Sequence, residues 1–164
     1  MAAYRFLVGI AALAAVVLTA SQGRTQVPDS RFAGWASAVI AADWTDSEGR
    51  PIDAFDNARR DLAAGFQAAG FDPSLMVDYS LRPDAARPVT ADAALQGFAA
   101  ATERGARGCL FYITSHGNPA GVVFGPNRHM TPRQMDAALD RVCQTRPTVV
   151  IVSACFSGVF VPAL

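Results

Sequence analysis

Strand-like and helix-like segments alternate along this chain, and this alternation restricts its fold more than any other feature. The apolar, strand-forming runs are residues 35–42, 75–79, 109–114 and 148–152. Segments with apolar side chains at helical spacing lie between them, at residues 53–70, 90–103 and 131–142. Strands joined by helices form parallel sheets with helices on both faces. The sequence therefore predicts an α/β fold, a three-layer sandwich with a mainly parallel sheet.

Local residue chemistry adds detail to this outline. Thr90 and Thr131 stand where helix N-caps are expected, and Pro132 occupies the first helical position after Thr131. Residues 120–124 form a short apolar run that predicts an accessory strand. The run at 148–152 is continuous and β-branched, so it is expected to be buried on both faces of the sheet.

The first 20 residues read as a secretory signal peptide. A short positively charged start is followed by an apolar run and then by the small residues Thr19, Ala20 and Ser21. The run is shorter than the roughly 20 apolar residues that span a bilayer, so we expect export with cleavage after Ala20 and no stable membrane span. Residues 21–33 are then a polar linker, and residues 34–164 form one periplasmic or extracellular domain.

Charge does not favour a nucleic-acid-binding protein. The formal net charge is zero, and the 14 basic residues are scattered arginines that form no basic stripe. The hydrophobic content of 51% is typical of a domain with a substantial core. We therefore expect a globular domain whose partner is not a nucleic acid.

Two of the predicted strands end in residues that can carry out covalent chemistry. Residues 109–114 run into Ser115-His116-Gly117, and residues 148–152 run into a polar segment that contains Cys155. The carboxyl ends of parallel strands meet at the ligand-binding edge of an open α/β sheet, so the imidazole and the thiol are expected to lie together. A thiol beside an imidazole is a nucleophile paired with a general acid/base.

Two glycines fit the same site. Without a Cβ atom, Gly117 lets the backbone approach a substrate, so its N–H and that of Cys155 are candidate oxyanion donors. Gly158 is expected to let the chain turn sharply after the nucleophile. His129 lies in a predicted loop and is assigned no role.

The three cysteines leave at least one thiol unpaired. Cys109 and Cys143 could pair with each other, which would leave Cys155 free. The alternative, which residue statistics favour, is that Cys109 and Cys143 are small buried apolar side chains. In either case an odd thiol in an exported protein is a candidate for reactivity.

The strand that ends in Ser115-His116-Gly117 and the strand that ends in Ser-Ala-Cys-Phe-Ser-Gly at 153–158 resemble the legumain-like cysteine peptidases, relatives of the caspases and gingipains. The resemblance covers roughly residues 35–164, including the predicted helix around 56–62, and is to bacterial exported members. It implies a caspase-like fold, Cys155 as nucleophile and His116 as general acid/base. It also implies a peptide or protein substrate, the Gly117 and Cys155 N–H groups as oxyanion donors, no metal and no organic cofactor.

The sequence departs from this family at several positions. Ser153 stands where eukaryotic legumains have Glu, and Ala54-Phe55 stand where they have Arg-His, so specificity for Asn or Asp is not implied. The third catalytic residue of legumains, an Asn, would fall near Asp43, although capping a turn is the commoner role for such an Asp. Only nine residues follow Cys155, whereas the family's fold continues with further strands, so we expect a fragment that lacks them.

Other functions fit parts of the pattern. A peptidase or transpeptidase acting through a thioacyl intermediate is the leading hypothesis. A non-catalytic caspase-like binding module, or an inactive fragment, is the alternative, because fold does not fix function. An α/β-hydrolase with Ser157 as nucleophile fits less well, since the Gly that its sharp turn needs two residues before the Ser is missing.

Overall fold

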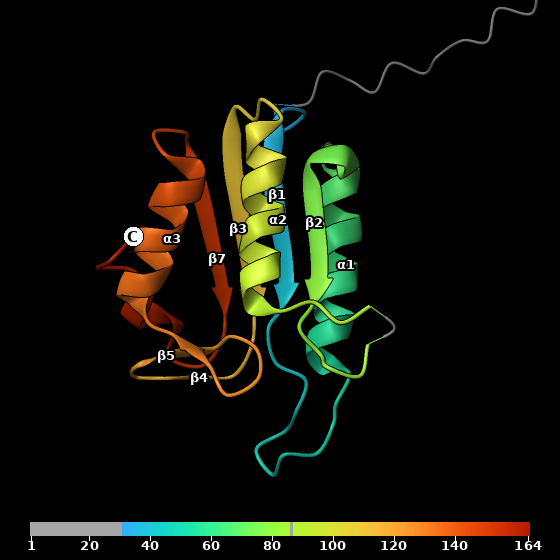
Figure 1. Ribbon diagram of the computed structural model, residues 1–164, viewed down its shortest axis with the longest axis vertical. Helices are drawn as coiled ribbons and strands as arrows, with labels where there is room; N and C mark the ends of the chain where they lie inside the picture. Colours follow the sequence, from blue (N-terminus) through green and yellow to red (C-terminus); the bar gives the residue numbers. More distant parts are fainter. Residues whose placement is uncertain (1–30, 86) are drawn as a thin grey trace, which may run out of the picture.

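A four-stranded parallel sheet forms the centre of the protein, as seen in a computed structural model that describes residues 31–85 and 87–164 (Figure 1). The strands are β1 (Trp35–Ala41), β2 (Met76–Ser80), β3 (Gly108–Thr114) and β7 (Thr148–Ser153). They lie side by side in the order β2-β1-β3-β7, and every neighbouring pair is parallel. The prediction of a mainly parallel sheet is confirmed, with each strand within one or two residues of its expected range.

Three helices complete the layers on the two faces of the sheet. One face carries α1 (Ala54–Ala68), and the other carries α2 (Ala91–Glu103) and α3 (Pro132–Cys143) (Figure 1). The structure is therefore an α/β arrangement with helices on both faces of a mainly parallel sheet, as a three-layer sandwich requires. Within the described ranges, no helix is both long enough and apolar enough to cross a membrane.

The helices begin where the sequence places their caps. The Thr90 hydroxyl accepts a hydrogen bond from the Ala93 N–H, which starts α2. At the start of α3, Thr131 and Gln134 form a reciprocal capping box, with Pro132 at the first helical position. Each cap satisfies backbone N–H groups that have no partner inside the helix, which contributes about 1 kcal/mol to stability.

The core is divided between the two faces of the sheet. Alternate residues of β1 and β3 point toward α2 and α3, where Ile40 and Phe111 pack with Phe98 of α2. The opposite face is smaller, with Val39 and Tyr112 packed near α1. Full burial of a side chain such as Phe98 stabilises the fold by about 1.5–3 kcal/mol, so the larger face supplies most of the hydrophobic stabilisation.

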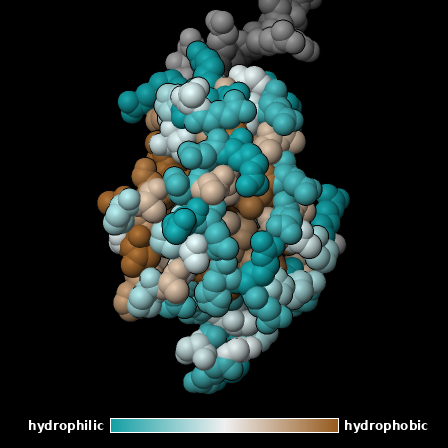
Figure 2. Space-filling model, turned by 60° about the vertical axis from the view of Figure 1, so that its left-hand side comes forward, coloured by the Kyte–Doolittle hydropathy of each residue, from teal (hydrophilic) through white to brown (hydrophobic). Residues whose placement is uncertain are grey.

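The expectation that residues 148–152 are buried on both faces is wrong. β7 is the last strand in the sheet order, and α1 packs mainly against β1, β2 and β3. The β7 side chains on that face are consequently open, with Val149 43% and Ile151 38% exposed. Figure 2 turns the side of the molecule that carries β7 forward, and it shows brown apolar surface among teal hydrophilic residues.

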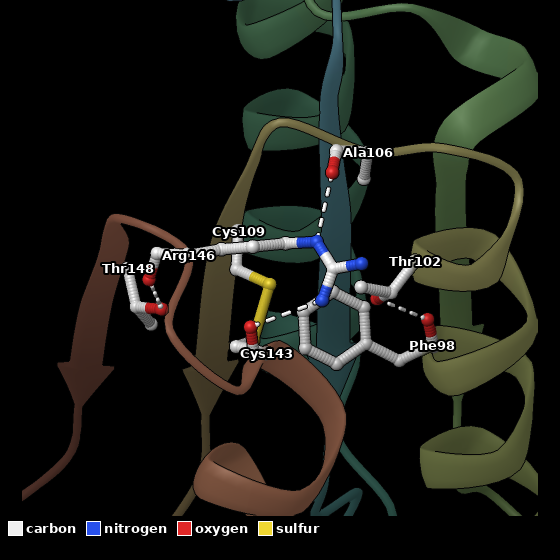
Figure 3. Close-up of a disulfide and its surroundings, with 7 residues drawn as sticks. All are labelled: Phe98, Thr102, Ala106, Cys109, Cys143, Arg146 and Thr148. Atoms are coloured by element: carbon white, nitrogen blue, oxygen red, sulfur yellow. Dashed lines mark hydrogen bonds between the residues drawn. A yellow bond between two sulfur atoms is a disulfide. The ribbon is translucent and has the colours of Figure 1, made fainter.

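A disulfide joins Cys109, near the start of β3, to Cys143 at the end of α3 (Figure 3). Both cysteines are buried, as the alternative of small apolar side chains predicts. The part of that alternative in which they are unbonded is wrong. The reason is tertiary, since the β3 start and the α3 end approach to a Cα–Cα distance of 6.1 Å, which a disulfide can bridge. Next to the bond, the Arg146 guanidinium donates to the carbonyl oxygens of Ala106 and Cys143.

A small antiparallel sheet follows β3. It consists of β4 (Gly117–Asn118), β5 (Gly121–Val123) and β6 (His129–Met130). β5 corresponds to the predicted accessory strand, whereas β4 and β6 are too short to leave a recognisable pattern in the sequence. His129, which was expected in a loop, lies on β6.

The start of the described chain lies within the predicted linker. The predicted signal peptide at 1–20 and residues 21–30 of the predicted linker lie outside the described residues. The Phe32 ring stacks on Phe71 at a centroid distance of 4.7 Å and contacts Trp35 edge-on. The packed part of the domain therefore begins at least two residues before the predicted boundary at 34.

Candidate active site

The register of β3 and β7 brings their carboxyl ends together. Thr114 pairs with Ser153, and one residue later the Ser115 N–H donates to the Ser153 carbonyl oxygen at 3.1 Å. His116 and Cys155 each follow two residues after the Thr114–Ser153 pair. The two segments predicted to carry the imidazole and the thiol therefore leave the sheet side by side.

Gly117 contacts the Cys155 segment directly. A Cβ atom added at Gly117 would lie 2.1 Å from the Cys155 carbonyl oxygen and 3.2 Å from the Ala154 Cβ. No side chain fits in that space, so glycine is required by the close approach of the two backbones. The backbone segment of His116 and Gly117 therefore lies in direct contact with the segment that carries Cys155.

The Gly117 N–H points away from the small sheet. Gly117 is opposite Val122, and the preceding pair is joined by a hydrogen bond from the Val123 N–H to the His116 carbonyl oxygen at 2.9 Å. Hydrogen-bonded and non-hydrogen-bonded pairs alternate in an antiparallel ladder, so Gly117 belongs to a non-hydrogen-bonded pair. Its N–H is therefore directed outward from β5 and is not used in the ladder of the small sheet.

The His116 ring is held by the loop that follows β1. Its Nε2 lies 3.0 Å from the Thr45 carbonyl oxygen, and the ring makes an edge contact with Phe55 at a centroid distance of 5.0 Å. A carbonyl oxygen only accepts hydrogen bonds, so this contact assigns the ring proton to Nε2. The Nδ1 atom is then the unprotonated nitrogen that can accept a proton from a thiol.

Asp43 stands at the base of that loop. Asp43 is 6% exposed, and its Oδ1 accepts from the Trp44 N–H, the Thr45 N–H and the Thr45 hydroxyl, at 2.7, 3.1 and 3.1 Å. These bonds make it a cap for the turn after β1, the role considered the commoner one. The atom that contacts the imidazole is the carbonyl oxygen of Thr45, two residues after Asp43.

Asp46 organises the tip of the same loop. Its carboxylate accepts from the Arg50 and Glu48 N–H groups and pairs with the Arg50 guanidinium at 2.8 Å. The Arg50 backbone N–H, then its side chain, hold the pKa of Asp46 below its ordinary value. The loop is therefore closed by its own polar contacts beside the imidazole.

Cys155 lies in an open turn. It is an exposed free thiol, whereas the other two cysteines are bonded to each other. The chain turns at Phe156, which has a left-handed φ of 58°, and Gly158, the expected turning residue, lies within the short helix η2 (Ser157–Phe160). A non-glycine residue in this conformation is uncommon and marks local backbone strain directly after the thiol.

A groove of about 430 Å³ begins just after this turn. It is lined by β7 and by the segment from η2 to the chain end, through Thr148, Val150, Val152, Ser157, Gly158, Phe160, Val161 and Leu164. Ser157, the alternative nucleophile, is half-buried in this wall and is not at the end of β7. Cys155 lies closer to the end of β7 and is exposed.

Sequence reasoning missed two contacts of the imidazole. Thr45 acts through its backbone carbonyl, which leaves no signature in a sequence. Phe55 was noted, with Ala54, as a departure from the Arg-His pair of legumains, and not as a contact of the imidazole. In the part of the chain that the structure describes, no three His, Cys, Asp or Glu side chains cluster closely enough to hold a metal ion. Comparison with protein-family models and with curated proteins gives no significant match for this chain.

Proposed function

We propose that this protein is an exported cysteine peptidase with a caspase-like fold, of the legumain-like type, and that Cys155 and His116 are its catalytic residues. The observation that carries the proposal is the close approach of Gly117 to the Cys155 backbone, since it makes the two strand ends one site. The Nε2 contact with Thr45 supports it, because it leaves Nδ1 able to act as a base. The buried Cys109–Cys143 disulfide supports export, since such bonds persist in oxidising compartments.

The proposed reaction proceeds through a thioacyl intermediate. The Cys155 thiol gives its proton to Nδ1 of His116, and the sulfur attacks the carbonyl carbon of the scissile peptide bond. The N–H groups of Gly117 and Cys155 stabilise the oxyanion. The C–N bond then breaks as His116 returns the proton to the departing amine. Water, deprotonated by His116, attacks the thioester, which releases the carboxylic acid and restores the thiol.

Mutation of the two residues tests this function. We expect the full chain to hydrolyse fluorogenic peptide amides from a mixed library, and Cys155→Ala to abolish that turnover. His116→Ala should lower it by about 10²–10⁴-fold, the usual contribution of a general acid/base. His129→Ala is the matched control, because it removes the other histidine of the chain from β6. Labelling by a peptidyl acyloxymethyl ketone that persists in Cys155→Ala would contradict the proposal.

A second candidate is a non-catalytic caspase-like binding module. The feature that favours it is the exposed apolar face of β7, where Val149 and Ile151 could contact a partner protein without use of the thiol. The two functions differ in the reactivity of Cys155. Slow alkylation of Cys155 by iodoacetamide, at the rate of an ordinary thiol and unchanged in His116→Ala, would favour the binding module.

A further inference from the structure

The Ser115 hydroxyl joins the end of β3 to the small sheet. Ser115 is 3% exposed, and its Oγ donates a hydrogen bond to the Val123 carbonyl oxygen of β5 at 2.7 Å. Its backbone N–H donates to the Ser153 carbonyl oxygen of β7 at 3.1 Å. Ser115 therefore holds the end of β3 to β5 through its side chain and to β7 through its backbone.

Val123 in turn holds the peptide that carries a candidate oxyanion donor. The Val123 N–H donates to the His116 carbonyl oxygen at 2.9 Å. That carbonyl group and the Gly117 N–H belong to the same peptide unit, and in a planar trans peptide the two groups point in opposite directions. The direction of the Gly117 N–H therefore follows from the bond at the His116 carbonyl oxygen.

The hydroxyl takes the place of a backbone donor in this contact. Two residues in a regular hydrogen-bonded antiparallel pair exchange both of their N–H···O bonds, so the His116 N–H would donate to the Val123 carbonyl oxygen. Among the residues that the structure describes, that oxygen instead takes its bond from the Ser115 hydroxyl. Val123 is thereby bonded through its N–H and its carbonyl group to two successive residues. We infer that Ser115 is a positioning residue that fixes the direction of the Gly117 N–H through Val123.

Loss of the hydroxyl would leave the Val123 carbonyl oxygen without this donor. A partly buried acceptor in that situation takes a bond from water or from a neighbouring N–H, because an unpaired polar group is costly. The His116 N–H is the donor that a regular ladder would supply, and its use would turn the backbone on the amino side of the 116–117 peptide. With either partner, β5 is free to shift relative to residues 115–117, and the Gly117 N–H changes direction.

The inference deepens the proposed function and rests on it, since the direction of the Gly117 N–H affects turnover only if this group stabilises an oxyanion. It predicts a selective effect. An oxyanion forms when the sulfur attacks a peptide carbonyl group. In contrast, the sulfur displaces iodide from the saturated carbon of iodoacetamide without forming an oxyanion. Ser115 should therefore affect peptide hydrolysis and not the alkylation of Cys155.

The test compares Ser115→Ala with Ser115→Thr in the full chain. Alanine removes the hydroxyl, and threonine keeps it. In Ser115→Ala we expect kcat and kcat/KM for a fluorogenic peptide amide to fall by the same factor, about 10-fold to 100-fold, because the misplaced donor acts only in the transition state. The rate of Cys155 alkylation by iodoacetamide should stay near the parent value. Ser115→Thr should keep both rates.

An NMR measurement follows the hydrogen bond itself. The scalar coupling across the bond joins the Val123 ¹⁵N nucleus to the ¹³C nucleus of the His116 carbonyl group. We expect this coupling in the parent and in Ser115→Thr, and its loss in Ser115→Ala. If Ser115→Ala does not fold, Ser115→Cys, whose thiol is a weaker donor, should give a weakened coupling and an intermediate turnover.

Thr102→Val is the matched control. Thr102 is 1% exposed, and its hydroxyl donates to the Phe98 carbonyl oxygen at 2.9 Å within α2, near the disulfide (Figure 3). Valine therefore removes a buried bond of the same kind, at the end of α2 that leads into β3. Turnover, alkylation and the coupling between Val123 and His116 should all match the parent.

Three results would overturn the inference. The first is a coupling in Ser115→Ala, or in Ser115→Cys if that variant is used, as strong as in the parent. The second is an equal fall in turnover and in alkylation rate in Ser115→Ala, since Ser115 would then support the thiol and the imidazole. The third is a Ser115→Thr variant that keeps the coupling and loses turnover. Failure of the proposed function is distinct, because the parent and Cys155→Ala would then show the same turnover while the coupling still reports on the 116–117 peptide.

Discussion

His116 and Cys155 follow neighbouring strands, but the surroundings of the two residues differ. β3 is buried along its whole length between β1 and β7, and the imidazole that follows it contacts Thr45 and Phe55. β7 lies at the edge of the sheet with an exposed face, and the thiol that follows it is exposed beside an open groove. The imidazole is therefore held from several sides, whereas the thiol has fewer contacts.

This difference indicates which contacts determine the positions of His116 and Cys155. The position of His116 is determined by the loop after β1 and by the core on both sides of β3. The position of Cys155 depends on fewer constraints, chiefly the β3–β7 pairing, the contact with Gly117 and the disulfide that anchors α3 before β7. Perturbations on the β7 side should therefore separate the two residues more easily than perturbations of the loop.

Removal of the disulfide should have the largest effect on stability. Cys109→Ala with Cys143→Ala releases a link between residues 34 apart, which should lower the free energy of unfolding by about 3–4 kcal/mol. Urea unfolding in a Cys155→Ala background measures this without thiol exchange. Cys155→Ala alone should leave the unfolding free energy nearly unchanged, because that thiol is exposed. An undiminished stability in the double variant would mean that the β7 side is anchored by other contacts.

Addition of one methyl group at Gly117 should have the second-largest effect on stability. Gly117→Ala places a Cβ 2.1 Å from the Cys155 carbonyl oxygen, so the two segments must separate, at a cost of about 1–3 kcal/mol. Turnover should fall as well, since the separation moves the thiol from the imidazole. Gly65→Ala in α1 is the control, because its new Cβ meets nothing within 4 Å apart from its chain neighbours and the backbone of its own helix, and alanine favours the helix. Equal effects at the two glycines would argue against a close contact.

Two isoleucines on the neighbouring strands allow a matched comparison of the two sides. Ile113 on β3 is fully buried, and Ile151 on β7 is 38% exposed. Ile113→Val should therefore cost about 0.5–1.5 kcal/mol of stability, and Ile151→Val less than about 0.5 kcal/mol. Chemical unfolding of both variants measures the difference. A cost at Ile151 as large as that at Ile113 would show that the face of β7 is covered in solution.

A change of Asp46, in the loop that holds His116, should have the smallest effect. It should alter only the pH dependence of stability. The pKa of Asp46 lies below its ordinary value, so its stabilising contribution is complete above that ordinary value of 3.8 and is lost as the pH falls through the folded-state pKa. Asp46→Asn keeps an acceptor for the loop but removes this titration. The fall in melting temperature from pH 6 to pH 3 should be smaller in Asp46→Asn than in the parent. An equal fall would mean that Asp46 makes no such contribution.

Most of the fold could be predicted because it depends on local pattern. The strands and helices follow from runs of apolar residues and from caps such as Thr90 and Thr131, and their alternation predicts the parallel sheet. The burial of β7 could not be predicted, because a continuous β-branched run looks the same in a central strand and at an edge. The pairing of Cys109 with Cys143 could not be predicted either, since it depends on where the end of α3 lies relative to the start of β3.

For the candidate site, the sequence alone determined which side chains have the chemistry of a nucleophile and a base, and that both stand at strand ends. It also indicated a glycine between them and an acidic residue after the first strand. Only the tertiary structure decided that Gly117 contacts the Cys155 backbone and that Thr45, through its carbonyl, contacts the imidazole. The chemistry of a side chain follows directly from the identity of the residue. The direction of a backbone carbonyl, in contrast, depends on contacts made after distant segments have packed together.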